Sequence, residues 1–131
     1  MSTFESTVTI NAAPDKIYNF LADMNNHRIL MPDNITNWAS TTDTATFTIP
    51  NITTLSLRIN ERVTNTLIRI IPEEKPPFEM ELNWQLSYNN EFTTISFSVT
   101  ANLNMFMKMM SSTPLQKLVN DETANLIKAL S

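Results

Sequence analysis

Hydrophobic and polar residues alternate along two parts of the chain, and a period of two predicts β-strands with one buried face. The first part covers residues 4–12. The second runs from Ile35 to Leu103, where the alternation predicts strands over 36–40, 44–49, 54–62, 65–71, 78–88 and 92–103. Asn89 and Asn90 have the chemistry of a hairpin turn between the last two strands. The pattern therefore predicts about seven strands.

Apolar residues change to helical spacing in two short segments after the first strand. The Ala-Pro-Asp sequence at 13–15 predicts a helix start, because it places proline at the first position and an acid in the first turn. Residues 25–27, Asn-Asn-His, interrupt this helix. Residues 28–31 then predict a second short helix, which Pro32 stops.

A long amphipathic helix is predicted at the C-terminus, after the methionine-rich run 105–110. Thr113 is its expected N-cap, Pro114 fits the first turn, and Gln116 completes a capping box. Apolar side chains fall on one face of this helix: Leu115, Leu118, Val119, Leu126 and Leu130. The helix must therefore lie on an apolar surface, which the sheet would provide.

These elements predict an α+β fold in one domain, 1–131, with the order β-α-α-β6-α. A sheet of consecutive hairpins is antiparallel, and its Thr/Ser/Glu face would lie in water. The terminal helix would cover the apolar face. A strongly curved sheet that wraps around a helix leaves a space that side chains fill or a ligand occupies.

The amino-acid composition excludes several kinds of functional site and argues against some kinds of partner. The chain has 131 residues, a net charge of -4, and neither cysteine nor glycine. The lack of cysteine excludes disulfides and thiolate metal sites, and the lack of glycine excludes the glycine-rich nucleotide loops. The acidic balance argues against nucleic acid, and no apolar run reaches the length of a membrane span. The sequence thus predicts a soluble cytoplasmic protein without a cofactor.

The order of elements resembles the helix-grip fold of the START-like superfamily (SRPBCC), which groups polyketide cyclases and dehydratases with lipid-transfer and pollen-allergen-like proteins. The most specific part is 8–23, VTINAAPDKIYNFLAD, which is similar to the family's opening strand and alanine-proline helix start. Met31-Pro32 followed by Trp38 is similar to the segment that comes next. The resemblance implies a cavity between sheet and terminal helix for a small apolar or amphipathic molecule. It implies no catalytic set.

Glu122 is the most informative polar residue, since it falls near the middle of the apolar stripe of the terminal helix. A carboxylate there could face the cavity, anchor a hydroxyl, amine or carbonyl of a ligand, and have its pKa raised by desolvation. The alternative is that Glu122 lies near the sheet's margin and reaches solvent or a basic partner.

Three further residues are weaker candidates. Glu61 and Arg69 share the inward parity of their strands, so either could be a buried anchor, or they could pair across adjacent strands. A second phase of the strand 65–71 would instead put Arg69 in water, and the position of Glu61 near a strand end favours its exposure. His27 could act as a general base, but its place between two helices favours a surface loop. One histidine without cysteine makes a metal site unusual.

The first hypothesis is a binding module whose cavity holds a small apolar or amphipathic ligand, anchored by Glu122. Its expected walls are Phe47, Leu57, Met80, Trp84, Phe97, Met105 and Met109. The methionines could line the cavity or fill the core. The second hypothesis is a cyclase- or dehydratase-like enzyme that uses Glu122, Glu61 or His27 as acid or base. A third is an interaction protein with a protein partner.

Overall fold

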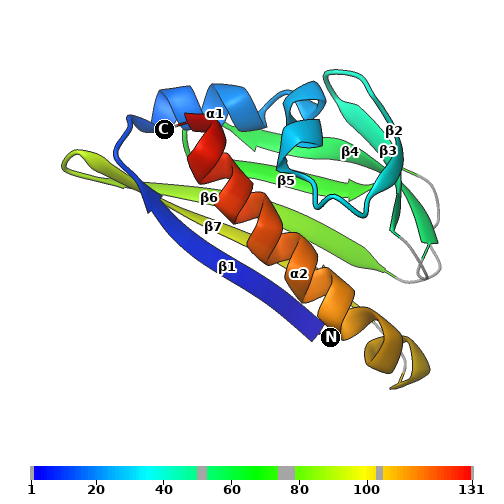
Figure 1. The fold of residues 1–131 in the computed structure, drawn as a ribbon. Coiled ribbons are helices and arrows are strands. Elements are labelled where there is room, and N and C mark those ends of the chain that lie inside the picture. The colour runs from blue at the N-terminus through cyan, green and yellow to red at the C-terminus, as the bar shows by residue number, and fades with distance from the viewer. Residues whose placement is uncertain (1, 50–52, 74–78, 103–104, 131) are drawn as a thin grey trace.

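The structure of the chain is a computed structural model that describes residues 2–49, 53–73, 79–102 and 105–130, with only the backbone for 53 and 105–114. The described residues form three helices and seven strands (Figure 1). The helices are α1 (Pro14–Leu21), the 3-10 helix η1 (Met24–Leu30) and α2 (Met105–Leu130). The strands are β1 (Ser2–Ile10), β2 (Thr36–Ser40), β3 (Thr44–Ile49), β4 (Thr53–Val63), β5 (Leu67–Pro72), β6 (Met80–Asn89) and β7 (Phe92–Ala101).

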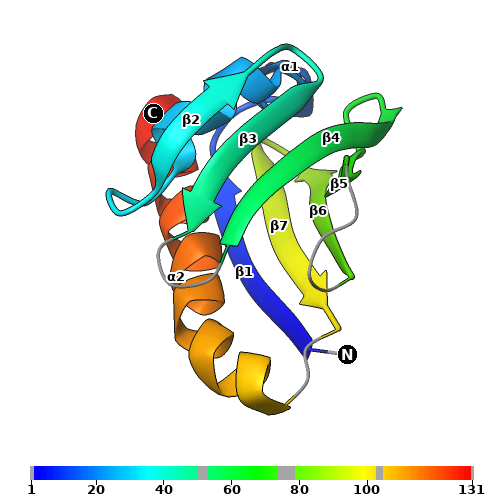
Figure 2. The same cartoon turned by 90° about the vertical axis from the view of Figure 1, so that its right-hand side faces the viewer.

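The strands form one antiparallel sheet in the order β1-β7-β6-β5-β4-β3-β2. The sheet is curved, and α2 runs along its inner side next to β1 (Figures 1 and 2). α1 and η1 close the same side at one end of the sheet, where η1 also packs against α2. This arrangement confirms the predicted α+β helix-grip fold.

The inner face of the sheet forms the hydrophobic core. On β6 and β7, alternate side chains are buried, as the period of two predicts: Met80, Leu82, Trp84, Leu86, Ile95, Phe97, Val99 and Ala101. Apart from that of Ala101, each of these buried side chains contributes about 1.5–3 kcal/mol to stability. The outer face is rich in hydroxyl groups, some of which pair across strands, as Thr7 and Ser96 do at 3.1 Å. The predicted alternation is therefore confirmed on both faces.

Asparagine takes the left-handed backbone positions in this chain without glycine. Asn37, Asn65 and Asn90 have φ angles of 57°, 60° and 59°. Asparagine tolerates this region better than other residues with a Cβ, because its short side chain can bond locally. Asn90 confirms the predicted turn between β6 and β7.

α2 begins earlier than the sequence predicts. It starts at Met105 and continues through Pro114, so the prediction of a helix start capped by Thr113 is wrong. Proline removes one backbone donor, but its fixed φ is close to the helical value, and a helix can continue through it with a bend. No helix in the described part of the chain is long and apolar enough to cross a membrane.

η1 includes residues 25–27, which the sequence analysis assigned to an interruption between helices. Asp23 caps η1, since its Oδ1 accepts a hydrogen bond of 2.9 Å from the backbone N–H of Asn25. A 3-10 helix has three residues per turn, so Met24, His27 and Leu30 share one face, and all three are buried. η1 therefore replaces the predicted short helix at 28–31.

Arg62, near the C-terminal end of β4, connects this strand to the end of α1 by hydrogen bonds. Its Nε and Nη2 donate to the carbonyl oxygen of Ala22 at 3.2 and 2.8 Å, and Nη2 lies 2.7 Å from Oδ1 of Asp43. A cation at the C-terminal end of a helix also interacts favourably with its dipole. Asp43 is largely exposed, so the ion pair itself contributes little.

We expect Arg62→Met to destabilise the protein by about 1–3 kcal/mol, because the carbonyl of Ala22 loses charged hydrogen bonds while the aliphatic stem is kept. The measurement is urea unfolding. Arg58→Met is the control, since Arg58 is exposed on the same strand. Equal stabilities of the two variants would contradict this role for Arg62.

Candidate functional site

One row of side chains crosses the inner face of the sheet at its middle. Ser6 of β1 pairs with Phe97 of β7, and Phe97 pairs with Trp84 of β6. The rings of Phe97 and Trp84 stack with centroids 4.0 Å apart, at an angle of 11°. From η1, His27 meets Trp84 edge-on, at 6.1 Å and 78°. Trp84 therefore lies between the sheet and η1 and is fully buried.

α2 brings Glu122 to the level of this row. The neighbouring residue, Thr123, has its Oγ1 2.7 Å from Oγ of Ser6. On the other side, Nδ2 of Asn125 donates to the carbonyl oxygen of Leu30 in η1 at 2.9 Å. Glu122, which precedes both of these residues in α2, is only 1% exposed. The prediction that this carboxyl is buried on the apolar face of the helix is confirmed.

Two buried polar atoms of this interior have no hydrogen-bond partner among the residues that the structure describes: Oε2 of Glu122 and Nε1 of Trp84. One is an acceptor and the other a donor. A buried polar atom without a partner costs about 1–3 kcal/mol, and folded proteins rarely keep one. Burial raises the pKa of Glu122 well above its usual value, so the neutral carboxyl is favoured.

His27 is buried, not on a surface loop, so that part of the sequence analysis is wrong. Its Nε2 donates to the carbonyl oxygen of Leu21 at 2.8 Å, which assigns the ring proton to Nε2. Burial lowers the pKa of His27 to about 4, although the bond to Leu21 and the charge of Asp23 oppose this. The imidazole is therefore neutral near pH 7, and its hydrogen bond ties η1 to α1. The spacing of three from Met24 to Leu30 was the signal for its burial.

Five of the side chains expected to line a cavity are buried on the inner face of the sheet: Phe47, Leu57, Met80, Trp84 and Phe97. Met105 and Met109 belong to α2, but their side chains lie outside the described residues. The interior thus combines apolar walls with Glu122 as the buried carboxyl. Contact of these residues with a ligand stays a prediction.

Glu61 faces away from the interior. A bulge between Ile59 and Glu61 shifts the register of β4, which places Glu61 opposite Arg69 of β5. Arg69 lies 3.1 Å from Glu61 and 2.7 Å from Glu81, on the outer face. The inward parity of Glu61 is wrong, and the alternatives, exposure near a strand end and pairing across adjacent strands, are confirmed. Ile68 and Ile70 are buried, so β5 takes the second predicted phase.

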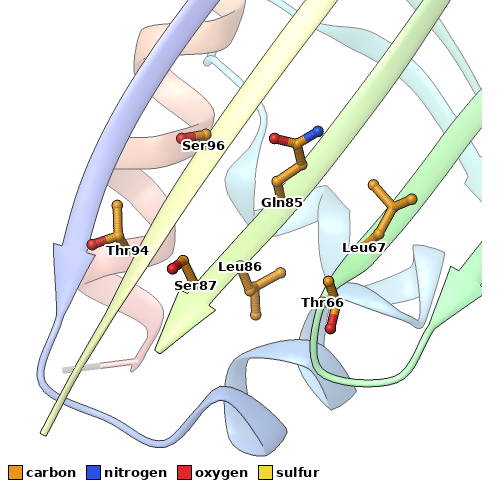
Figure 3. Close-up of a pocket in the computed structure, with 7 residues that line it drawn as sticks. All are labelled: Thr66, Leu67, Gln85, Leu86, Ser87, Thr94 and Ser96. Carbon is orange, nitrogen blue, oxygen red and sulfur yellow. The ribbon is translucent and has the colours of Figure 1, made fainter. Parts of the chain in front are cut away.

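Two surface pockets are formed by described residues. One, of about 280 Å³, lies between η1 and β2 and is lined by residues that include Arg28, Pro32 and Trp38. The other, of about 310 Å³, opens on the outer face over β6 and β7 (Figure 3). Neither includes Glu122 or Trp84 in its lining.

No protein-family model matches the chain, and no curated protein matches it in sequence. Solved structures match over nearly its whole length. XoxI from Bacillus cereus has a TM-score of 0.75 at 13% identity, over 98% of this chain and 95% of that one. The Aha1 dimer from Colwellia psychrerythraea has a TM-score of 0.64 at 18% identity, over 99% and 93%. A START superfamily protein from Mycobacterium smegmatis has a TM-score of 0.63 at 15% identity, over 98% and 93%. These similarities show that the chain has the START-like fold.

Proposed function

We propose that this protein binds a small apolar or amphipathic molecule between the sheet and α2, with Glu122 and Trp84 as its polar anchors. The observation that carries the proposal is the pair of buried atoms without partners, Oε2 of Glu122 and Nε1 of Trp84. A bound molecule would satisfy both atoms. The START-like fold and the apolar inner face support the same function. The lack of cysteine supports a cytoplasmic location.

The chemistry of the anchors suggests the kind of head group. A neutral carboxyl of Glu122 both donates and accepts hydrogen bonds, whereas Nε1 of Trp84 only donates. An uncharged hydroxyl or carbonyl oxygen fits both groups. The buried side chains around them are apolar, and a charged head group there would lose its hydration without gaining a fixed counter-charge. The ligand is therefore an uncharged oxygen-bearing head on an apolar body.

His27 has a positioning role in this account. It is neutral, and its edge lies against the indole of Trp84. Because Nε2 is held by the carbonyl of Leu21, the imidazole cannot turn to take the Trp84 N–H as a partner without losing its own bond. The indole donor is thus left available for a ligand.

Native mass spectrometry of the purified protein, followed by denaturing extraction, tests this function. We expect a stoichiometric apolar molecule with the wild-type chain. Glu122→Leu should release it, because leucine fills the space but offers no hydrogen bond. Glu122→Gln should retain it, because an amide donates and accepts as the neutral carboxyl does.

The two variants separate the alternatives. A ligand that is lost from Glu122→Gln as well as from Glu122→Leu would be an amine held by the ionised carboxylate. Equal ligand content in all three proteins would contradict anchoring by Glu122. A wild-type protein that neither carries such a molecule nor takes up a long-chain alcohol would contradict the proposed function.

A further inference from the structure

The outer face of the sheet carries a pocket of about 310 Å³, a volume within the range of small-molecule sites (Figure 3). Its polar wall consists of Gln85 and Ser87 from β6 and Thr94 and Ser96 from β7. In Figure 3, α2 lies behind these strands. The pocket and the interior around Glu122 are therefore on opposite sides of the sheet.

Neither Gln85 nor Ser87 has a side-chain hydrogen bond to any residue that the structure describes, and both are exposed. The hydroxyl groups of β7 are held from the other side by β1. Oγ of Ser96 lies 3.1 Å from Oγ1 of Thr7. The pocket thus presents a free amide and a free hydroxyl beside a hydroxyl whose position is fixed.

None of the described residues that line this pocket is charged. Its amide and hydroxyl groups each donate and accept hydrogen bonds, so the best complement is a ligand whose groups also do both. Anions offer only acceptors and ammonium groups only donors, and either would lack a counter-charge here. Leu67, at the start of β5, adds an apolar part to the wall. The C–H face of a sugar ring fits such a surface.

From this lining we infer that the outer pocket binds a neutral polyhydroxylated ring, of the size of a monosaccharide or one unit of an oligosaccharide. Gln85 and Ser87 would bind its hydroxyl groups, and Leu67 would contact its C–H face. This site is independent of the ligand proposed for the interior, since it uses none of the same residues.

The test is a titration of ¹⁵N-labelled protein with glucose and galactose, followed by the backbone amide signals. We expect saturable shifts at Gln85, Ser87 and Thr94 for at least one of these sugars. Glucosamine and glucuronate, which carry opposite charges, should bind at least about fivefold more weakly, because a desolvated charge finds no partner in the pocket.

Two substitutions on the outer face provide the comparison. Gln85→Leu should weaken binding at least about fivefold, since it removes an amide that both donates and accepts. Ser98→Ala, on the outer face of β7 but outside the pocket lining, should change the affinity less than about twofold. Absence of saturable shifts at the pocket with both neutral sugars would overturn the inference. So would equal binding by the charged analogues or by Gln85→Leu.

Discussion

The contribution of Glu122 to the free energy of unfolding should fall as the pH rises above 4.5, until this carboxyl ionises in the folded state. Burial raises the pKa of this carboxyl well above 4.5. In the unfolded chain the same group ionises near 4.5. Between these two values only the folded state binds the proton, so stability is present at low pH and is lost as the pH rises.

His27 has the opposite effect on the free energy of unfolding: its contribution increases as the pH rises. Its pKa is about 4 in the folded state and 6.5 when unperturbed. Between these values only the unfolded state binds the proton, so the contribution of His27 to stability is complete above pH 6.5 and is lost as the pH falls toward 4. From pH 4.5 upward the contributions of the two groups to stability change in opposite directions.

Urea unfolding at a series of pH values, on the wild type and on Glu122→Gln, measures this effect. Removal of the buried carboxyl should abolish the decline that Glu122 causes as the pH rises. The variant should instead become more stable as the pH rises from 4.5 to 6.5, because His27 binds a proton there only in the unfolded state. Parallel curves for the two proteins would show that Glu122 does not keep its proton on folding.

Truncation of Trp84 should have the largest effect of any single substitution in the row across the sheet. We expect Trp84→Ala to destabilise the protein by about 3–5 kcal/mol, since it removes a fully buried ring from a stack on Phe97 and an edge contact with His27. Trp84→Phe should cost much less. It keeps an aromatic ring and also removes a buried N–H that has no partner among the described residues.

Trp38 provides the matched control for that comparison. Its Nε1 donates to Oγ of Ser40 at 3.0 Å, and its ring stacks on Phe47. Trp38→Phe therefore loses a satisfied hydrogen bond, whereas Trp84→Phe loses an unsatisfied donor. Chemical unfolding of the three variants is the measurement. A larger loss in Trp84→Phe than in Trp84→Ala, or no loss in Trp84→Ala, would contradict the packing described here.

Much of this structure follows from periodicity. The alternation of apolar and polar residues correctly predicted the bounds of β2 and β3. The apolar stripe of the terminal helix correctly placed Glu122 in the interior. These signals work because a residue's parity or helical angle decides which face it occupies. Glu61 shows the limit of the method. One extra residue in the bulge of β4 reverses the parity beyond it, and nothing in the local sequence marks that residue.

Two features of the proposed site were harder to predict from the sequence: the burial of His27 and the unpaired N–H of Trp84. The burial of His27 depends on a 3-10 helix, and Asn25-Asn26 was interpreted as a break because asparagine is common in turns. The buried position of Trp84 was predicted. Its unpaired N–H was not, because the lack of a partner depends on side chains from several elements that meet only in the fold.

The indole N–H signals give the most direct test of the central claim, that Trp84 donates to a ligand held at Glu122. The chain has two tryptophans, so a ¹H–¹⁵N spectrum shows two indole signals, and Trp38→Phe assigns them. During titration of delipidated protein with decanol, the account predicts that the Trp84 signal moves downfield to saturation, as an N–H that gains an acceptor does. The Trp38 signal, already bonded to Ser40, should stay in place. A Trp84 signal that stays fixed while decanol binds would contradict the account.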